Sequence, residues 1–349
     1  MRKLKVGYIP YSPNLTHPAD RRRLVYWARK RGHELVLDTD LKCDVVFKTV
    51  RADLGENAKM NKKTPYILDL VDGYLGPETF WRDWLRGAGK VVTGNISGPI
   101  RPFRKIIENA CSSASAVVCE TSEQSRTIEP FSTNVHSILD FHEEFPFLPI
   151  KTNLSSQKSV SLFWEGLPYT AKGLVLLRDF FTINHNDNSI SLEMVTDLEY
   201  PLLLGKYFSK STIDIVKNIA GTSGSCIKVT EWSIESVISA AQRAKIAVLP
   251  LDPKGVLNPL KAENRLLIMW RLGLPTLTSP SNAYLRVMNQ LEIDGICGSS
   301  EEWTKKLHHL IDSERLQKEM VQNGQQYIRD THSEELILQA WDRVFESVL

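Results

Sequence analysis

Two side chains that could move a proton occur in the first third of the chain, His17 and Asp72. His17 lies in a polar loop after the apolar run 3–10, and Asp72 follows the run 64–71, directly before a glycine. An imidazole or a carboxylate at the exit of a strand can act as a general base or contact a sugar hydroxyl. Both residues also have a structural role open to them. The histidine could cap a helix or lie on the surface, and the aspartate could stabilise its own turn.

Lys172 is a candidate for binding phosphate. It follows the expected strand 160–166, at the start of a helix expected over 171–183, and a glycine comes directly after it. The N-terminus of a helix presents free N–H groups and partial positive charge, to which a lysine adds a full charge. We therefore expect Lys172 to meet a diphosphate group as a point charge.

A polar cluster opens the helix expected over 260–272. It consists of Lys261, Glu263, Asn264 and Arg265. Lys261 and Arg265 are four residues apart, so on a helix they would share one face and could contact phosphate oxygens together. A carboxylate at the start of this helix could bind the hydroxyls of a ribose. A solvated helix face is the alternative interpretation of the same pattern.

The sequence lacks the spacings of several other kinds of site. No H-E-x-x-H occurs, and the adjacent pair His308 and His309 would point to different sides of a helix. The only Asp-x-Asp, Asp38 to Asp40, leads into a loop. The G-x-G-x-x-G of dinucleotide binding and the G-x-S-x-G of serine hydrolases are absent. We expect neither a metal site nor a bound dinucleotide.

The elements that must position these side chains alternate between strand and helix. Short β-branched or aromatic runs, bounded by turn residues, predict strands. They occur at 3–10, 33–39, 44–49, 64–71, 116–121 and 135–139, and again at 160–166, 189–195, 226–232, 245–251, 275–279 and 294–299. The segment 142–158, with two prolines, is expected to be a linker. The alternation predicts two α/β domains with parallel sheets, and the cleft between them is the expected ligand site.

The end of the chain follows a different pattern. Three successive helices are expected at 300–312, 314–329 and 333–349. The last has a capping-box spacing at its start and apolar side chains every four residues. A wide apolar stripe of this kind must be buried against another part of the protein.

Composition excludes several classes of protein. Of the 349 residues, 42% are hydrophobic and 24% are charged, so a folded core is expected rather than disorder. No apolar run approaches the roughly 20 residues that a membrane span requires. The N-terminus does not have the pattern of a signal peptide. The five cysteines are widely spaced and are expected to be reduced cytosolic thiols.

Charge is distributed unevenly along the chain, although the net charge is only +2. Residues 1–105 contain 21 Lys and Arg against 11 Asp and Glu, whereas residues 106–349 contain 22 against 30. A basic first third favours a phosphate-bearing ligand, an anionic membrane face or nucleic acid, with a solvated surface as the alternative. Nucleic acid is not expected as a partner, because no motif combines basic and aromatic residues.

Three stretches resemble glycosyltransferases of the GT-B fold, and most closely the family 4 (group 1) nucleotide-sugar transferases. They are ASAVVCETSEQSRTIEP with NVHSILD, LFWEGLPYTAKGLVLL, and LNPLKAENRLLIMWRLGLPTLTSPSNAY with the downstream SEEWTKKLHHLIDSERLQKEMVQNGQQYI. The resemblance covers most of residues 115–349. Residues 1–114 match only in the order of their elements.

The resemblance implies an α/β fold of two Rossmann-like domains facing across a cleft. The N-terminal domain, 1–150, would bind the acceptor, and the C-terminal domain, 151–330, would bind the nucleotide-sugar donor. Residues 331–349 would form a helix that crosses back onto the N-terminal domain. Lys172 would correspond to a phosphate-contacting lysine, and Lys261, Asn264 and Arg265 would lie at the donor-binding helix.

One feature departs from the family pattern. The family commonly has two glutamates eight residues apart, the second five residues before the glycine of a Gly-x-Pro. Counting back from Gly273 gives Ile268 and Leu260, which are both apolar. Glu263 could take over ribose binding from a neighbouring turn. The retaining or inverting outcome of the reaction is left open by this difference.

The implied function is metal-independent transfer of a sugar from a nucleoside-diphosphate sugar to a glycan or lipid-linked acceptor, as in cell-surface polysaccharide synthesis, with no cofactor. Asp72 or His17 would contact acceptor or sugar hydroxyls. The enzyme is expected in the cytoplasm, with a peripheral contact to the inner face of the cell membrane through its basic N-terminal domain. Two alternatives are a non-catalytic nucleotide- or glycan-binding subunit of the same fold and a sugar-nucleotide epimerase.

Overall fold

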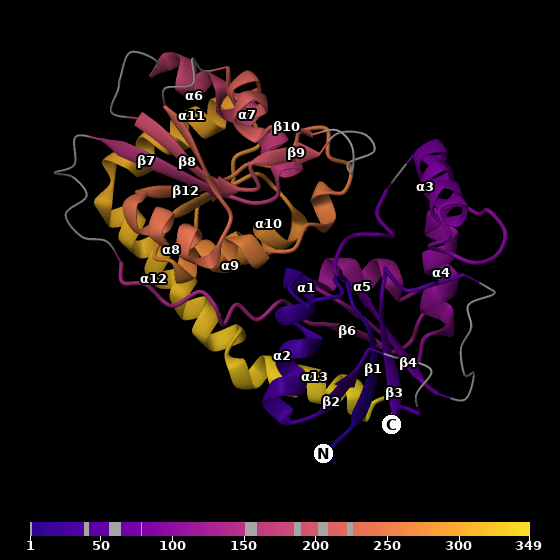
Figure 1. Cartoon of the computed structure of the whole chain (residues 1–349). Coiled ribbons are helices and arrows are strands. Elements are labelled where there is room, and N and C mark those ends of the chain that lie inside the picture. Colours follow the sequence, from indigo (N-terminus) through magenta and orange to yellow (C-terminus); the bar gives the residue numbers. More distant parts are fainter. Residues whose placement is uncertain are drawn as a thin grey trace. The chain divides into compact units, whose positions relative to one another are not determined.

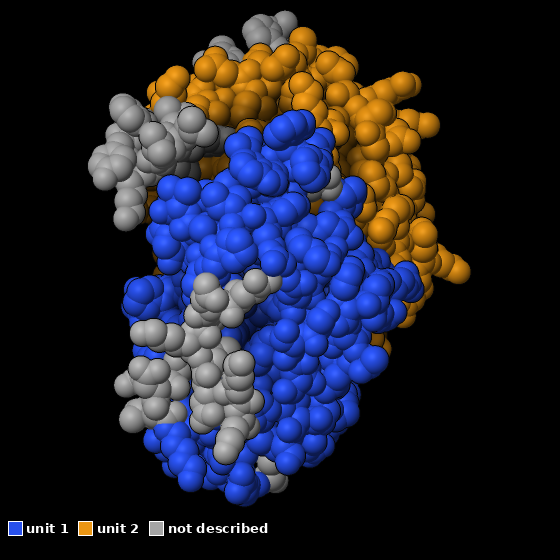
Figure 2. All heavy atoms as spheres, turned by 90° about the vertical axis from the view of Figure 1, so that its right-hand side faces the viewer, with its two compact units in different colours: residues 1–142, 260–262, 332–349 blue, residues 143–259, 263–331 orange. Residues whose placement is uncertain are grey.

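The structure is a computed structural model of the whole chain, shown in Figure 1. It describes residues 2–37, 42–55, 64–77, 79–150, 159–184, 190–201, 209–221 and 226–349. The pair Asp38 and Asp40 and the residues 151–158 of the expected linker lie outside this description. The chain divides into two compact units. Unit 1 comprises residues 1–142, 260–262 and 332–349, and unit 2 comprises residues 143–259 and 263–331 (Figure 2).

Unit 1 is built around a six-stranded parallel sheet with the order β2-β1-β3-β4-β5-β6. The strands are β1 Lys5–Ile9, β2 Glu34–Val36, β3 Val45–Thr49, β4 Tyr66–Leu70, β5 Ala116–Cys119 and β6 Val135–Ser137. The described helices are α1 Pro18–Arg21, α2 Leu24–Arg31, α3 Phe80–Val92, α4 Phe103–Ser113, α5 Ser122–Ile128 and α13 Glu334–Glu346. Helices pack on both faces of the sheet, so its central strands are apolar on both sides.

The last helix, α13, belongs to the core of unit 1. Trp341 and Phe345 are fully buried there, and Phe345 stacks on Trp27 of α2 with ring centroids 4.1 Å apart. Asp342 accepts a hydrogen bond from Trp27 Nε1 at 2.7 Å. The apolar stripe of this C-terminal helix is therefore buried against β1, β3 and α2, which come from the N-terminal part of the chain (Figure 1).

Unit 2 contains a five-stranded parallel sheet with the order β11-β8-β7-β12-β13. The strands are β7 Val160–Glu165, β8 Ile190–Thr196, β11 Ile227–Glu231, β12 Ile246–Leu249 and β13 Thr276–Thr278, and a separate hairpin pairs β9 Glu199–Pro201 with β10 Ser209–Ser211. The described helices are η2 Pro168–Leu177, α6 Arg178–Ile183, α7 Thr212–Ala220, α8 Ile234–Arg243, η3 Asn258–Leu260, α9 Asn264–Arg271, α10 Asn282–Gln290, α11 Ser300–Asp312 and α12 Glu314–Thr331. The strand expected at 294–299 is reduced to a single parallel bridge between Thr278 and Ile296.

The predicted fold class is confirmed: each unit has a parallel sheet with crossover helices, and the C-terminal helix returns to the first unit. The boundaries expected from the sequence are 1–150, 151–330 and 331–349, whereas the first division of the chain in the structure falls between His142 and Glu143. Among the described residues, no helix is both long and apolar enough to span a bilayer.

Two expected helices have different starts. The helix expected over 171–183 is a 3₁₀ segment, η2, followed by the short α6. The helix expected over 260–272 begins only at Asn264. The carbonyl of Leu260, ahead of this helix, accepts a hydrogen bond from Gln124 Nε2 at 3.0 Å. Lys261 precedes the helix, and the premise that Lys261 and Arg265 share one helix face is wrong.

Candidate functional site

The carboxyl ends of β7 and β12 form the natural ligand position of unit 2. The chain runs from β7 to β8 and β11 on one side, then returns to β12 and β13 on the other. Ligands of open parallel sheets bind at such a reversal of strand order. Gly173 of η2 packs on the exit of β12 so closely that an added Cβ would lie 2.3 Å from the Pro250 carbonyl oxygen. This close approach explains the need for glycine at that position.

Arg265 lies at the exit of β7. Its NH2 group donates to the carbonyl of Glu165, its Nε lies 3.9 Å from Glu165 Oε2, and its guanidinium carbon lies 5.3 Å from the centre of the Trp164 ring. A Cβ added to Gly166 would lie 3.2 Å from the same guanidinium carbon. These contacts orient the fork of Arg265 before any ligand arrives, which suits recognition of a phosphate.

Lys172 is exposed on η2, one residue before Gly173. Among the described residues, no side chain or carbonyl forms a hydrogen bond or ion pair with it. Its charge is therefore available to a ligand at the exit of β12. The two cations thus belong to elements that border the reversal of strand order: Lys172 is in η2, whose Gly173 packs on the exit of β12, and Arg265 is in α9 and contacts the exit of β7.

Glu263 and Asn264 lie at the start of α9. Asn264 is the first helical residue and is half-buried. Glu263 is only 1% exposed, and its Oε1 accepts a hydrogen bond from Arg286 NH2 at 2.8 Å. The pKa of the neighbouring Tyr327 is raised, first by burial and then by the charge of Glu263. In this pair the partly exposed Arg286, rather than the buried carboxylate, is the group accessible to solvent.

Asp72 and Lys261 are brought together in unit 1. Asp72 Oδ1 lies 3.1 Å from Lys261 Nζ, and both side chains are about one third exposed. The same Oδ1 accepts a hydrogen bond from the backbone of Gly73 at 3.1 Å. Asp72 therefore also stabilises its own turn, which is the structural role considered from the sequence. Its exposure leaves it within reach of a ligand.

His17 caps helix α1. Its Nδ1 accepts a hydrogen bond from the backbone N–H of Ala19 at 3.2 Å, and its ring stacks on Tyr11. Burial lowers the pKa of His17, so the ring is neutral near pH 7. A neutral imidazole that accepts at Nδ1 carries its proton at Nε2. The geometry therefore makes Nε2 a hydrogen-bond donor and gives the ring a structural role.

A buried charge cluster lies behind the carboxyl ends of the strands in unit 1. The guanidinium of Arg23 is fully buried and donates to both oxygens of Asp69, at 2.7 and 3.1 Å. It also donates to the Ile138 carbonyl at 2.6 Å and lies 3.4 Å from Asp140. The bidentate geometry of Arg23 with Asp69 is the strong form of such a pair.

Glu120 adjoins this cluster and was not singled out from the sequence. It follows β5 directly and is 9% exposed. Its pKa is raised well above the usual value, first by burial and then by the nearby negative charges of Asp140, Asp72 and Asp69, against the lowering effect of Arg23. A carboxyl group of raised pKa can carry a proton near neutral pH. Its place at a strand exit is the same signal that identified Asp72.

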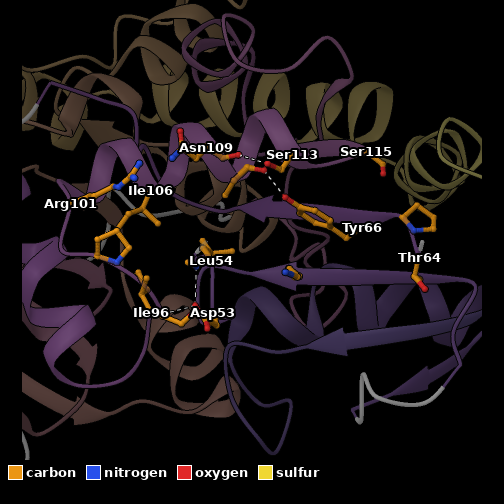
Figure 3. A pocket seen from close by; sticks show the side chains of 16 residues that line it. Asp53, Leu54, Thr64, Tyr66, Ile96, Arg101, Ile106, Asn109, Ser113 and Ser115 are labelled. Carbon is orange, nitrogen blue, oxygen red and sulfur yellow. Dashed lines mark hydrogen bonds between the residues drawn. The ribbon is translucent and has the colours of Figure 1, made fainter. Parts of the chain in front are cut away.

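Unit 1 also contains a cavity of about 670 Å³, which Figure 3 shows from close by. It lies over β3 and the start of β4, beside α4, and its lining includes Lys48, Asp53, Tyr66 and Asn109. Lys48 is 4% exposed, and its Nζ lies 4.7 Å from the centre of the Tyr66 ring. None of the predicted site residues lines this cavity. It occupies a face of the sheet rather than the carboxyl edge.

No group of three or more His, Cys, Asp and Glu side chains within the described ranges has the arrangement of a metal site.

The comparisons with known proteins identify the fold. The chain matches no sequence family and no curated protein. HepE from Anabaena, crystallised with UDP-glucose, shares 10% identity at a TM-score of 0.60, over 99% of each chain. WaaG, a glycosyltransferase involved in lipopolysaccharide biosynthesis, shares 11% identity at a TM-score of 0.59, over 98% of this chain and 99% of its own.

TarM is a further similar structure, with 12% identity and a TM-score of 0.59 over 92% of this chain. The present chain spans only 57% of the length of TarM. These neighbours are glycosyltransferases of the GT-B fold. The resemblance seen in the sequence is thereby confirmed for the fold.

Proposed function

We propose that this protein transfers a sugar from a nucleoside-diphosphate sugar to a glycan or lipid-linked acceptor. The observation that carries the proposal is the pair of cations at the reversal of strand order in unit 2. Lys172 and Arg265 border the two strand exits, and the close packing of Gly173 brings η2 against one of them. Support comes from the shared fold with HepE, which was crystallised with UDP and with UDP-glucose.

The chemistry requires stabilisation of a leaving diphosphate. As the glycosidic bond breaks, negative charge develops on the diphosphate oxygens, and cations held in place before the reaction lower the barrier. Lys172 would supply a point charge and Arg265 a planar fork. Asn264 and the N-terminus of α9 would add N–H donors, with Glu263 and Arg286 beside them. The proposal needs no metal ion.

The acceptor side is assigned to unit 1. Asp72 and Glu120 would contact the acceptor hydroxyl, and a carboxylate among them would take its proton during transfer. His17 would contact a sugar hydroxyl through its Nε2–H. A lipid-linked acceptor would place a cytoplasmic enzyme at the inner face of a membrane, as the basic first third of the chain also suggests.

Calorimetry with UDP, GDP and ADP, each with and without EDTA, tests donor binding. We expect one diphosphate to bind, equally well with EDTA, and Lys172→Met to weaken its binding about tenfold through loss of one charge-assisted contact. Lys305→Met is the matched control, because Lys305 is an exposed lysine elsewhere in unit 2. Equal affinity of Lys172→Met and the parent would contradict the site, and loss of binding with EDTA would contradict metal independence.

Incubation with nucleotide sugars separates transfer from the two alternatives. Diphosphate release that depends on an added acceptor identifies a transferase. Conversion of the sugar without acceptor identifies an epimerase. Binding without either reaction identifies a non-catalytic subunit, which the apolar and buried Leu260 and Ile268 would then explain.

A further inference from the structure

Helix α3 carries its apolar side chains on the outside. Five large apolar residues of this helix are exposed, to between 36 and 78%: Phe80, Trp81, Trp84, Leu85 and Val92. At 100° per residue they fall within one continuous arc of the helix. Exposed apolar residues normally occur singly, and a contiguous group on one face indicates an interaction surface.

The opposite side of α3 is polar or small and faces α4. Asp83 is buried, and its Oδ1 accepts a hydrogen bond from the backbone of Arg104 at 2.8 Å. A Cβ added to the buried Gly87 would lie 1.9 Å from the Arg101 carbonyl oxygen. The helix is therefore fixed in its orientation by close backbone contact. It cannot rotate to bury its apolar arc without losing this packing.

The charge on α3 is positive apart from one carboxylate. Arg82 is exposed next to the apolar arc, whereas Arg86 and Lys90 are half-buried on the α4 side, over the Phe103 ring at 4.4 and 5.1 Å from its centre. The only acidic residue of the helix is the buried Asp83. The exposed surface of α3 thus combines tryptophan, phenylalanine and leucine with the cation of Arg82 and no acidic side chain, a composition that suits a helix lying in the interface of an anionic bilayer.

We propose that α3 is a membrane-docking helix, with its apolar arc inserted among the headgroups of an anionic lipid surface and Arg82 on the lipid phosphates. A second copy of the chain is a less suitable occupant. A helix of 13 residues is about 20 Å long, and one face of it is small beside the roughly 800 Å² per partner of a stable interface. The proposal holds whether or not the chain transfers sugar.

Sedimentation with vesicles tests the proposal. The parent protein is expected to bind vesicles of phosphatidylglycerol and phosphatidylcholine more strongly than vesicles of phosphatidylcholine alone. The variant Phe80→Ser/Trp81→Ser/Leu85→Ser should lose at least about tenfold in binding to the anionic vesicles, because three inserted apolar side chains are removed. The control Ile183→Ser/Leu285→Ser/Leu349→Ser removes three exposed apolar side chains elsewhere and should bind like the parent.

Three outcomes would overturn the proposal. They are no binding of the parent to anionic vesicles at low salt, equal binding of parent and α3 variant, and a parent dimer that the α3 variant abolishes. A second measurement avoids any dependence on the stability of the triple variant. Acyl-brominated lipid should quench tryptophan emission of the parent, and Trp81→Phe/Trp84→Phe should still bind but lose that quenched component. Unchanged quenching in this variant would also contradict the proposal.

Discussion

The carboxyl ends of the two sheets differ in the sign of the charge that they hold. In unit 1 this edge gathers the carboxyl groups of Asp69, Glu120 and Asp140 around a buried Arg23, with Asp72 paired to Lys261 nearby. In unit 2 the corresponding edge presents Lys172, Arg265 and Arg286, while Glu165 and Glu263 lie behind them in hydrogen bonds. Both sheets are parallel and are covered by helices, so the architecture alone does not produce this difference in charge.

The difference in charge between the two sheet edges indicates how one architecture can support two binding roles. Cations that are held in place and partly exposed suit a diphosphate, whose charge they offset. Carboxylates of unequal exposure suit hydroxyl groups, which need acceptors and a base. The comparison therefore supports the proposal that unit 2 binds the donor and unit 1 the acceptor, on electrostatic grounds that are separate from the fold.

The largest effect is expected for Arg23→Met in unit 1. Removal of the buried guanidinium takes from Asp69 its bidentate partner, whereas Asp140 keeps its ion pair with Arg22 at 3.8 Å. We expect a cost of about 3–5 kcal/mol in the free energy of unfolding. Denaturant unfolding measures this loss. Arg2→Met is the control, because Arg2 pairs with Asp44 at the surface, and it should cost at most about 1 kcal/mol. A small loss for Arg23→Met would show that the cluster does not organise this edge.

The second largest effect is expected for Glu120→Gln, which should lower turnover rather than the stability of the fold. We expect the transfer rate to fall by about a hundredfold, in the range of general acid–base effects, with diphosphate affinity unchanged. Glu129→Gln is the control, because Glu129 is an exposed glutamate directly after α5, and this variant should keep the activity of the parent. Unchanged turnover in Glu120→Gln would remove this residue from the acceptor side.

The pH dependence of stability supplies a second readout for Glu120. Its pKa is raised in the folded state, so its contribution to stability is present below the unfolded pKa and is lost as the pH rises through the folded pKa. The amide of Glu120→Gln stays neutral. The variant should therefore match the parent in acid and be at least as stable at neutral pH. Lower stability of the variant at neutral pH would indicate a structural ion pair instead.

A smaller effect is expected for Arg265→Lys in unit 2. Lysine keeps the charge but loses the planar fork, so diphosphate binding should weaken by about tenfold or less. Calorimetry measures the change. Arg315→Lys, in an exposed pair with Glu319 on α12, is the control and should bind like the parent. Full affinity in Arg265→Lys would mean that this edge offers charge alone and no specific geometry.

Strand and helix alternation allowed the fold class to be predicted, because period and turn signals are local properties of the chain. The candidates Lys172 and Arg265 could be proposed for the same reason, since strand exits are visible in sequence. The raised pKa of Glu120 could not be recognised, because it arises from burial beside Asp140 and Asp69, which come from other segments of the chain. The start of α9 at Asn264 was also missed, and the preceding Leu260 carbonyl is held by Gln124 from α5.

Two amphipathic helices separate what the sequence determines from what the tertiary structure determines. The spacing of residues in α3 and α13 predicts an apolar stripe on each helix, since a helix has a fixed period. The spacing does not predict what each stripe contacts. In α13 the stripe is buried against α2 and the sheet of unit 1, whereas in α3 the close approach of Gly87 to α4 turns the polar side inward. Which side of a helix meets solvent depends on the neighbours that arrive from distant parts of the chain, and only the folded structure decides it.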